Sequence, residues 1–585
     1  MGVRYLHSFM EQKVNGGIYM VNMQQEILKA KKRIERPLIV FDLMALFGLF
    51  CSDRHSLLCG SQYWVVEYMA DTFFKRLTDL GAELVFFYDG TLQTSKYDTW
   101  ITRQNDKYDR MIDIIDAIDA GVPVTVVAKK FDRTMPSNTC IKLQNVAKRH
   151  GKLITANDLE CDQAVAIFAT KNKALAVVSH DTDFLIFEGS WQLWHAEHIN
   201  LQKLSTKAYN RQALIGTLGL QWYQMAVWAT LAGNDWFKYD EVLPFLNDLG
   251  PHSQKMYRLA DYVRRLPMRN KKLDEDGIQC VLGRVYRKRR MPAEAYELFR
   301  QSVAFYQVDE HPENERKHTN DPFAYLLQAE HFFTYSILTG EPFNVTLFFF
   351  DYRSNEFGKY HEIVEPIISR IGGILLYHHR HERQHVTVMM KRHHKESNSF
   401  GDVPVTYPSA ITPPPVRELI AKDENEPPGS PSSLLSLKLQ LWRWVCSDDL
   451  LHDERFNGIP SAFMCTVLTL YRLRQCGAIR IFEADLLLVI AQQLSTRTFD
   501  PLQEPSPQRL ISRAFRLAFL FQKVYGHMER VSKALGLPDE YRPTTPYDGH
   551  RFHNMYRVWA GRKVESQDIA PIVEWRIYAH ASQST

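Results

Sequence analysis

Two carboxylates, Asp181 and Asp183, directly follow a run of apolar and β-branched residues, ALAVVS. Such a run is typical of a strand buried on both faces of a parallel sheet. Open α/β sheets place their ligands at the carboxyl ends of these strands. Two unpaired anions at this place would repel each other and raise a pKa, so the spacing indicates a bound cation.

More acids occupy comparable places between residues 37 and 235. The segments PLIVFDLM, ELVFFYDG and KLITAND are expected to be strands that alternate with helices, which predicts βαβ units and a largely parallel sheet. Right-handed crossovers would bring the strand ends to one edge. The acids expected near that edge are Asp42, Asp89, Glu160, Asp162, Asp181, Asp183 and Asp235.

Seven converging carboxylates need counter-charge, because uncompensated anions are strongly destabilising. Hard oxygen ligands are those that Mg²⁺ and Mn²⁺ prefer. Many carboxylates around two such ions is the arrangement used for phosphodiester cleavage. The acids therefore predict a site for two Mg²⁺ or Mn²⁺ ions.

The chain resembles the flap-endonuclease/XPG nuclease superfamily, with its PIN-like fold, in the segments MGVRYL, VFDLMALF, VFFYDG, LECDQA, SHDTDFLIF and LAGND. Within that superfamily it is most similar to the asteroid and constitutive-coactivator-of-PPAR-gamma branch, through CGSQYW and a Pro-rich insert. The resemblance covers residues 1–240. It implies an α/β fold in which a PIN-like, largely parallel sheet is flanked by helices, followed by mainly α-helical carboxy-terminal regions.

The resemblance also implies how the acids share the ions. Glu160, Asp162 and Asp181 would hold one metal directly. Asp183 and Asp235 would hold the second, partly through water, and Asp42 and Asp89 would support the cluster.

Three further residues receive roles from the same resemblance. Gly2 would lie near the substrate, because it is small and has a free amine once Met1 is removed. Lys96 and Arg103 are seven residues apart, which places them on one helix face. They would steer the scissile phosphate and stabilise the charge that develops on it. Interleaved acids also allow an ordinary solvated helix face at this place.

One departure from the flap endonucleases bears on the substrate. After Asp235 the chain continues WFKYDEVLPFLNDLGPHSQ, without the glycine-rich hairpin that grips duplex DNA in that family. We therefore expect a nuclease acting on nucleic acid with a single-stranded or flapped part or an end, either DNA or RNA. The alternative is a non-catalytic RNA-binding or transcriptional coactivator scaffold with the same fold.

The sequence suggests four parts: a nuclease-like domain (1–240), a helical extension (241–395), a disordered Pro/Ser linker (396–433) and a helical domain (434–585). We interpret the leucine and aromatic stripes of the helical domain as its core, and this domain could also bind a protein partner. A basic cluster, Arg287-Lys288-Arg289-Arg290, joins aromatic positions and could bind single strands through phosphates and stacking. It could equally be the cationic face of an amphipathic helix, and it is a candidate nuclear-localisation signal.

Two local patterns need separate interpretation. The β-branched segment VPVTVVA (122–128) is expected to be a strand after the long charged helix of residues 94–121. His381 and His385 match H-E-x-x-H, the zinc-protease pattern. Their neighbours GGILLY and VTVMM do not suit a buried ligand helix, so we interpret this region as a His-rich basic surface.

Composition restricts the setting. The 585 residues carry a net charge of only +4, so nucleic-acid affinity must come from local patches. Eight scattered cysteines without a C-x-x-C pair indicate reduced thiols. The sequence shows no signal-peptide pattern and no apolar run of membrane-spanning length. We expect an intracellular protein, nuclear or cytoplasmic, without a membrane partner.

Overall fold

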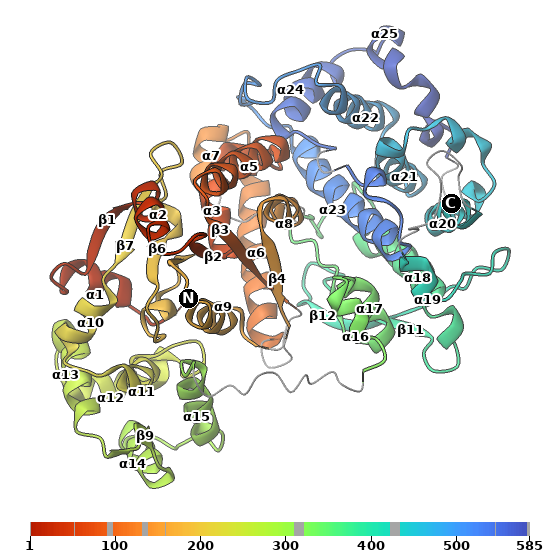
Figure 1. Cartoon of the computed structure of the whole chain (residues 1–585). Coiled ribbons are helices and arrows are strands. Elements are labelled where there is room, and N and C mark those ends of the chain that lie inside the picture. The colour runs from red at the N-terminus through yellow and green to blue at the C-terminus, as the bar shows by residue number, and fades with distance from the viewer. Residues whose placement is uncertain are drawn as a thin grey trace. The chain divides into compact units, whose positions relative to one another are not determined.

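The computed structural model describes residues 2–51, 53–90, 97–130, 139–157, 159–308, 321–421, 433–543 and 546–581 (Figure 1). The chain forms two units that exchange segments along the sequence. Unit 1 comprises Met1–Phe50, Met69–Thr91 and Leu143–Lys317. Unit 2 comprises Cys51–Tyr68, Leu92–Lys142 and His318–Thr585.

A seven-stranded sheet with the order β1-β7-β6-β5-β2-β3-β4 forms the centre of unit 1. The strands β2 to β6 run parallel to one another, and β7 pairs antiparallel with both β6 and β1. The predicted fold class, an α/β protein with a largely parallel sheet, is confirmed. The strand bounds are β1 (Ile18–Asn22), β2 (Leu38–Asp42), β3 (Glu83–Asp89), β4 (Lys152–Ala156), β5 (Ala176–Ser179), β6 (Gln192–His195) and β7 (Ser205–Tyr209).

Helices cover both faces of this sheet because its central strands are apolar on both sides. The helix α9 (Cys161–Lys171) packs on one face, where Val40, Val85 and Phe87 share a core with Val165. The carboxy-terminal part of α5 (Tyr63–Asp79) packs on the other. There the ring of Phe74 lies 5.7 Å from that of Phe41 and 4.7 Å from that of Phe86.

Other helices of unit 1 lie before the first strand, between β1 and β2, or after β7 (Figure 1). Apolar residues of α11 and α15 are buried in the same core, which ties these later helices to the sheet. The bounds are α1 (Leu6–Gln12), α2 (Met23–Lys31), α10 (Arg211–Leu218), α11 (Trp222–Ala232), α12 (Tyr239–Leu249), α13 (Lys255–Arg264), α14 (Glu275–Val285) and α15 (Ala295–Phe305).

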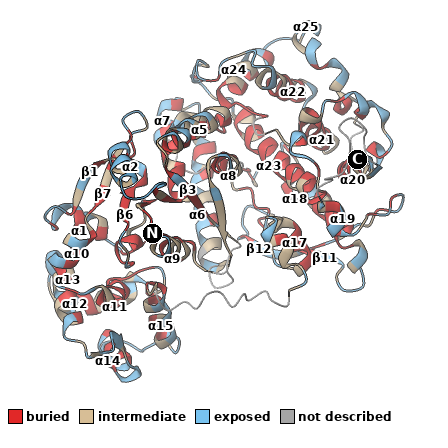
Figure 2. Ribbon diagram, in the orientation of Figure 1, coloured by how far each residue is buried: buried red, intermediate tan, exposed pale blue. Residues whose placement is uncertain are grey.

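Unit 2 is mainly helical, as predicted for the carboxy-terminal region. Its 23-residue helix α23 (Ser512–Ala534) is buried along most of its length (Figure 2). Around it lie α18 (Tyr360–Leu375), α20 (Ser433–Cys446), α21 (Ser461–Gln475), α22 (Ile481–Thr496) and α24 (Gly549–Trp559). None of the described helices combines the length and hydrophobicity needed to cross a bilayer.

The long charged helix forms as predicted, as α6 (Tyr97–Asp119), and it belongs to unit 2. Tyr108 and Ile115 on its apolar face are 1% and 0% exposed. The hydroxyl of Tyr108 lies 2.9 Å from His394 Nδ1, which ties α6 to the later part of the chain. The helix is thus an integrated element of unit 2.

The predicted strand at residues 122–128 is wrong, because this segment forms the helix α7 (Val124–Lys130). Val124, Val127 and Ala128 are buried, and their i, i+3, i+4 spacing is that of one helix face. Their β-branched character suggested a strand, but packing within unit 2 selects the helix.

The prediction of disorder over 396–433 needs correction for its first part. β12 (Ser399–Pro404) pairs with β11 (His385–Met390), which itself pairs with β10 (Phe343–Asn344). Val403 of β12 is 3% exposed, so burial on one face orders this segment despite its polar composition. Residues 422–432 lie outside the described part of the chain. The predicted boundaries at 240, 395 and 433 do not coincide with the two units, and they stay a prediction.

Candidate metal centre

The carboxyl ends of neighbouring parallel strands bring acidic residues to one edge of the sheet. Asp42 is the last residue of β2, and Asp89 is the last residue of β3. Asp181 and Asp183 follow β5, which pairs directly with β2. This is the edge at which the sequence places the metal site.

Three of these acids form a close group, Asp162, Asp181 and Asp183. One carboxylate oxygen from each lies within 4.8 Å of the others. Asp183 is 5% exposed, whereas the other two are partly exposed. The group is therefore open on one side and buried on the other.

Local structure fixes the two acids that follow β5. Asp181 caps the 3₁₀ helix η3 (Thr182–Leu185), and its Oδ1 accepts a hydrogen bond of 2.9 Å from the backbone N–H of Asp183. The backbone N–H of Asp181 donates to Ser179 Oγ at 3.1 Å. This turn holds both carboxylates on one short loop.

The third acid comes from the first turn of α9. Glu160 is the N-cap of this helix, and Asp162 follows two residues later. A carboxylate in the first turn is stabilised by the positive end of the helix dipole. The helix therefore offsets part of the repulsion within the group.

Gly2 lies against the same loop. A Cβ atom at this position would lie 2.3 Å from Asp181 Oδ1 and 2.9 Å from the backbone N of Asp183. The φ angle of Gly2 is +45°, which also favours glycine. Thr182 Oγ1 donates to the carbonyl of Val3 at 3.3 Å and joins the two segments. Only a residue without a side chain fits here.

Burial and repulsion between the carboxylates raise the pKa of three acids at this edge, Asp183, Asp162 and Asp42. Burial raises the pKa of Asp183 to about 8, and the charge of Asp181 adds to this rise. Burial and the charge of Asp181 likewise raise the pKa of Asp162 well above its usual range. Burial raises the pKa of Asp42 to about 6, against the hydrogen bond from Ser179. Without counter-charge, the site resists full ionisation at neutral pH.

Two hydroxyl groups hold individual carboxylates in place. Ser179 Oγ donates to Asp42 Oδ2 at 2.8 Å, while the backbone N–H groups of Met44 and Ala45 donate to Asp42 Oδ1. The buried hydroxyl of Tyr306 donates to Asp183 Oδ1 at 2.6 Å. Both carboxylates are thus oriented from the protein side.

A polar network continues behind Tyr306. Asn234 Nδ2 donates to the Tyr306 hydroxyl at 3.2 Å and to Ser302 Oγ at 2.8 Å. Ser302 Oγ lies 2.7 Å from Thr230 Oγ1. The residues of this network are buried, so the position of the Tyr306 hydroxyl is well defined.

This donor set fits a divalent cation. Mg²⁺ binds carboxylate oxygens at about 2.1 Å, so oxygens on opposite sides of one ion lie about 4.2 Å apart. The three oxygens within 4.8 Å of one another are close to that arrangement. A cation would also relieve the repulsion that raises the pKa of Asp162 and Asp183. We infer that Asp162, Asp181 and Asp183 could hold Mg²⁺ or Mn²⁺.

The other predicted ligands lie around this group at the same edge. The charge of Asp89 raises the pKa of Asp42, and the charges of both residues raise the pKa of Asp162. Asp235 is exposed, and its charge raises the pKa of Asp183. The structure groups Asp183 with Asp162 and Asp181, whereas the resemblance pairs it with Asp235. The division of seven ligands between two ions stays a prediction.

Lys96 and Arg103 are the two predicted phosphate-steering residues. Lys96 lies outside the described residues. Arg103 is exposed on α6, which belongs to unit 2. Their roles stay predictions.

The basic cluster at residues 287–290 is exposed in the segment between α14 and α15. Lys288 Nζ lies 2.6 Å from Asp248, and the guanidinium of Arg289 donates to the carbonyl of Glu241. Two of the four cations therefore already have partners in unit 1. The role of the cluster in nucleic-acid binding or nuclear import stays a prediction.

His381 and His385 do not share a helix. His385 is the first residue of β11, and His381 precedes it in a turn. The zinc-protease pattern needs both histidines on one helix face. This geometry agrees with interpreting the motif as a chance match.

Sequence reasoning missed Ser179, Asn234 and Tyr306. Ser179 and Asn234 lie within the segments SHDTD and LAGND, so their proximity in sequence to the acids was a usable signal. Tyr306 lies 123 residues from Asp183 in the sequence, and no local pattern marks it.

No family model matches the sequence. The chain is 27% identical over 242 residues to the constitutive coactivator of peroxisome proliferator-activated receptor gamma of Bos taurus, which covers 40% of this chain and 33% of that protein. It is 26% identical over 240 residues to the Homo sapiens protein, which covers 40% and 26% respectively. The match thus spans about a third or less of these relatives. It confirms the predicted resemblance to the constitutive-coactivator branch.

Several solved structures are similar to part of this chain. The catalytic core of Rad2 in complex with DNA substrate is 14% identical, with a TM-score of 0.31, over 54% of this chain and 90% of that chain. Human GEN1 in complex with Holliday junction DNA is 12% identical, with a TM-score of 0.30, over 58% and 76%. Flap endonuclease-1 from Methanococcus jannaschii is 11% identical, with a TM-score of 0.26, over 52% and 98%.

Proposed function

We propose that this chain is a metal-dependent nuclease that hydrolyses phosphodiester bonds in DNA or RNA with single-stranded parts or ends. One observation carries the proposal: the oxygens of Asp162, Asp181 and Asp183 lie within 4.8 Å of one another at the carboxyl edge of a parallel sheet. The resemblance to the flap-endonuclease superfamily supports it. Two Mg²⁺ or Mn²⁺ ions are the expected cofactors.

When bound, divalent cations supply an activated water and neutralise charge on the reacting phosphate. In this proposal the protein supplies the geometry. Asp162, Asp181 and Asp183 provide ligand oxygens, and Tyr306 and Asn234 keep Asp183 oriented from behind. Ser179 holds Asp42 beside them.

Gly2 keeps the approach to Asp181 narrow but unfilled, since a side chain there would displace the carboxylate. Lys96 and Arg103 are proposed to steer the phosphate. The exposed face of the acidic group is where the substrate would enter.

The test is cleavage of end-labelled single-stranded and flapped DNA and RNA in Mg²⁺ and in Mn²⁺. The Asp181→Asn/Asp183→Asn variant removes two ligand charges and conserves side-chain volume. Its matched control is Glu275→Gln/Asp276→Asn, an exposed acidic pair in the first turn of α14. We expect metal-dependent products from wild type and control and none from the site variant. Products that persist in the site variant would refute the proposal.

A second candidate is a non-catalytic RNA-binding or transcriptional scaffold that keeps the nuclease fold. The sequence relatives are named as constitutive coactivators, which favours this candidate. The same panel separates the two candidates. Tight binding of a nucleic acid without cleavage in either metal, equal in wild type and site variant, would favour the scaffold.

A further inference from the structure

An exposed tyrosine in an unusual backbone conformation lies close to the acidic group. Tyr5 has a φ of +63° and a side chain 46% exposed. Residues other than glycine rarely adopt positive φ, and such conformations concentrate at functional sites. Tyr5 is the N-cap of α1, but its side chain makes no capping hydrogen bond. No side-chain capping bond therefore offsets the backbone strain at Tyr5.

Tyr5 belongs to a cluster of exposed or half-exposed aromatic and cationic side chains from three segments. Its ring lies 5.5 Å from that of Tyr239 and 5.4 Å from that of His252, both edge to face. The guanidinium of Arg4 lies 5.5 Å from the Tyr5 ring and 4.8 Å from the Tyr239 ring. We call Arg4, Tyr5, Tyr239 and His252 the Tyr5 surface.

Backbone contacts connect the Tyr5 surface to the metal centre on two sides. On one side, Gly2 touches Asp181 and Asp183, and Arg4 and Tyr5 follow within three residues. On the other, the backbone N–H of Arg4 donates to the carbonyl of Gly233 at 3.4 Å. Gly233 packs so closely on Tyr239 that an added Cβ would lie 2.7 Å from the Tyr239 Cα.

The same Gly233 segment also leads to Asp183. Asn234, the next residue, donates to the Tyr306 hydroxyl, which in turn donates to Asp183. The Tyr5 surface and the acidic group are thus fixed by one short set of connections within unit 1. Tyr5 follows Gly2 by three residues, which span at most about 11 Å. A nucleotide strand that presents a phosphate to the carboxylates would therefore have a nearby nucleotide within reach of Tyr5.

The chemistry of the Tyr5 surface suits an unpaired nucleotide. Aromatic faces stack on any base, and a nearby cation attracts the phosphate. Arg4 is 53% exposed, and its ion pair with Asp240, which is 87% exposed, spans 3.8 Å. A solvent-exposed pair of this length is weak, so a phosphate could displace Asp240.

We propose that the Tyr5 surface is a subsite for an unpaired nucleotide flanking the scissile phosphate, with Tyr5 stacking on its base and Arg4 contacting its phosphate. This inference rests on the proposed function for the position of the scissile phosphate. It assigns the substrate a single-stranded stretch at this place, and it needs no cleavage to be tested.

The test measures binding of fluorescein-labelled oligothymidylate by fluorescence anisotropy in EDTA. All variants are made in the full chain carrying Asp181→Asn/Asp183→Asn, which removes cleavage and charge repulsion together. Tyr5→Gly deletes the ring at a backbone position that glycine adopts without strain, so the fold is preserved or stabilised. Tyr5→Phe keeps the ring. Tyr19→Ala removes another exposed tyrosine of unit 1, one that is 42% exposed.

We expect Tyr5→Gly to weaken binding by about 5- to 150-fold, the range for loss of one base–aromatic stack. Tyr5→Phe and Tyr19→Ala should bind like the parent. An oligonucleotide of abasic residues should bind Tyr5→Gly and the parent equally, because it has no base to stack. Arg4→Gln should weaken both oligonucleotides and reduce the salt dependence of binding.

Two results would overturn the inference. One is oligothymidylate affinity unchanged by Tyr5→Gly. The other is an equal loss for the abasic oligonucleotide, which would show that Tyr5 does not contact the base. The outcome is independent of the cleavage test: a protein that binds through Tyr5 but does not cleave would retain this subsite and lose the proposed function.

Discussion

Opposing influences act on the carboxylate of Asp183. Burial and the charge of Asp181 raise its pKa to about 8, while the hydrogen bond from Tyr306 lowers it. Asp183 must be ionised to bind a cation, so Tyr306 favours the metal-binding form. Tyr306, 123 residues away in the sequence, would thereby raise the affinity that we propose for a divalent cation at this site.

Replacing Tyr306 with phenylalanine tests this role. Without the hydrogen bond the pKa of Asp183 rises further, so Mn²⁺ should bind more weakly at neutral pH and recover as the pH increases. Changes in residues that support a metal ligand typically alter affinity by about 10- to 100-fold. Calorimetric titration with Mn²⁺ across the neutral to alkaline range measures this.

The matched control for Tyr306→Phe is Tyr286→Phe. The hydroxyl of Tyr286 donates to Glu241 at 3.0 Å, in the same unit but outside the metal centre. It should leave Mn²⁺ affinity unchanged. Equal affinities for both variants at every pH would exclude a role for Tyr306 in metal binding.

Gly2 offers a steric test of the same site. Gly2→Ala would place a Cβ 2.3 Å from Asp181 Oδ1, so the carboxylate must move and Mn²⁺ affinity should fall about tenfold or more. Gly16→Ala is the control, because Gly16 has a φ of +64° but no atom within 4 Å of an added Cβ. If both variants lower the Mn²⁺ affinity by the same factor, the strain of alanine at a positive φ, and not the contact with Asp181, would be responsible for the loss.

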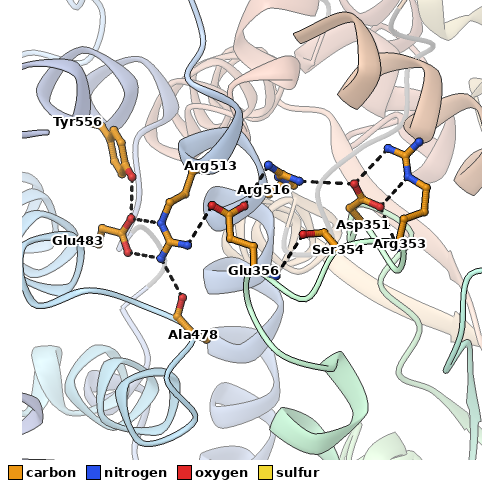
Figure 3. Close-up of polar contacts among 9 residues, drawn as sticks. All are labelled: Asp351, Arg353, Ser354, Glu356, Ala478, Glu483, Arg513, Arg516 and Tyr556. Carbon is orange, nitrogen blue, oxygen red and sulfur yellow. Dashed lines mark hydrogen bonds and ion pairs between the residues drawn. The ribbon is translucent and has the colours of Figure 1, made fainter. Parts of the chain in front are cut away.

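At the scale of elements, a network of ion pairs connects the helices of unit 2 (Figure 3). Arg513 and Arg516 of α23 both contact Glu356, and Arg516 also contacts Asp351. Arg513 binds Glu483 of α22 through two nitrogens at 2.6 and 2.8 Å. The network continues through Arg353, which pairs with Asp351 and with Asp116 of α6.

The two ends of this network, Glu483 and Asp116, differ in burial, which predicts different effects of their substitution on the free energy of unfolding. Glu483 is 0% exposed and also accepts hydrogen bonds from Tyr556 and the backbone N–H of Arg480. Breaking a buried pair leaves a charge without its partner, so Glu483→Gln should lower the free energy of unfolding by about 3 kcal/mol. Asp116 is exposed, and Asp116→Asn should cost about 0–1 kcal/mol.

Urea denaturation of the two variants measures this difference. The helix α6 should remain folded in Asp116→Asn, because its apolar face still packs within unit 2. Equal destabilisation by the two variants would contradict the assignment of stability to the buried end.

At the scale of the whole molecule, the chain passes between the two units several times. Residues 51–68 and 92–142 belong to unit 2 although they lie within the sequence of the nuclease-like region. The buried Asp548, for example, accepts a hydrogen bond from Gln62 at 3.2 Å and caps α24. Unit 2 is therefore incomplete without the amino-terminal part of the chain.

Asp548 makes the stability of unit 2 depend on pH. Burial raises its pKa to about 7, so between about pH 4 and 7 the folded state holds a proton that the unfolded state has lost. Stability should therefore fall as the pH rises through this window. Asp548→Asn removes this dependence. The free energy of unfolding of the variant should exceed that of wild type by an amount that grows to about 2–4 kcal/mol by pH 7 and stays constant above it.

Thermal and urea unfolding of wild type and Asp548→Asn at several pH values give the difference. Asp500→Asn serves as the control, since Asp500 is exposed. A difference between Asp548→Asn and wild type that does not change with pH would mean that Asp548 is already ionised in the folded state.

The exchange of segments also predicts how a shortened chain behaves. A chain ending at residue 308 would retain α6 but lose the packing partners of Tyr108, Met111 and Ile115, which are 0–2% exposed in the full chain. It should bind a hydrophobic dye and aggregate. Co-expression of residues 309–585 as a second chain should restore solubility. A soluble, dye-free short chain would show that α6 does not need unit 2.

The sequence by itself determined the sheet and the acidic edge. Apolar runs such as LIVF before Asp42 and AVVS before Asp181 report local burial, and strand–helix alternation implies parallel pairing. Once the strands are parallel, their carboxyl ends must meet, so the acids converge by geometry. Each of these inferences uses residues close together in the chain.

The tertiary structure alone decided the features that depend on distant partners. Tyr306 reaches Asp183 across 123 residues, and no periodicity records such a contact. Val124 and Val127 form a helix, and Ser399–Pro404 a strand, because neighbours from unit 2 or β11 bury them. Local propensity differs by at most about 1 kcal/mol per residue, less than the free energy of burying one large apolar side chain. Long-range packing therefore overrides local preference at these positions.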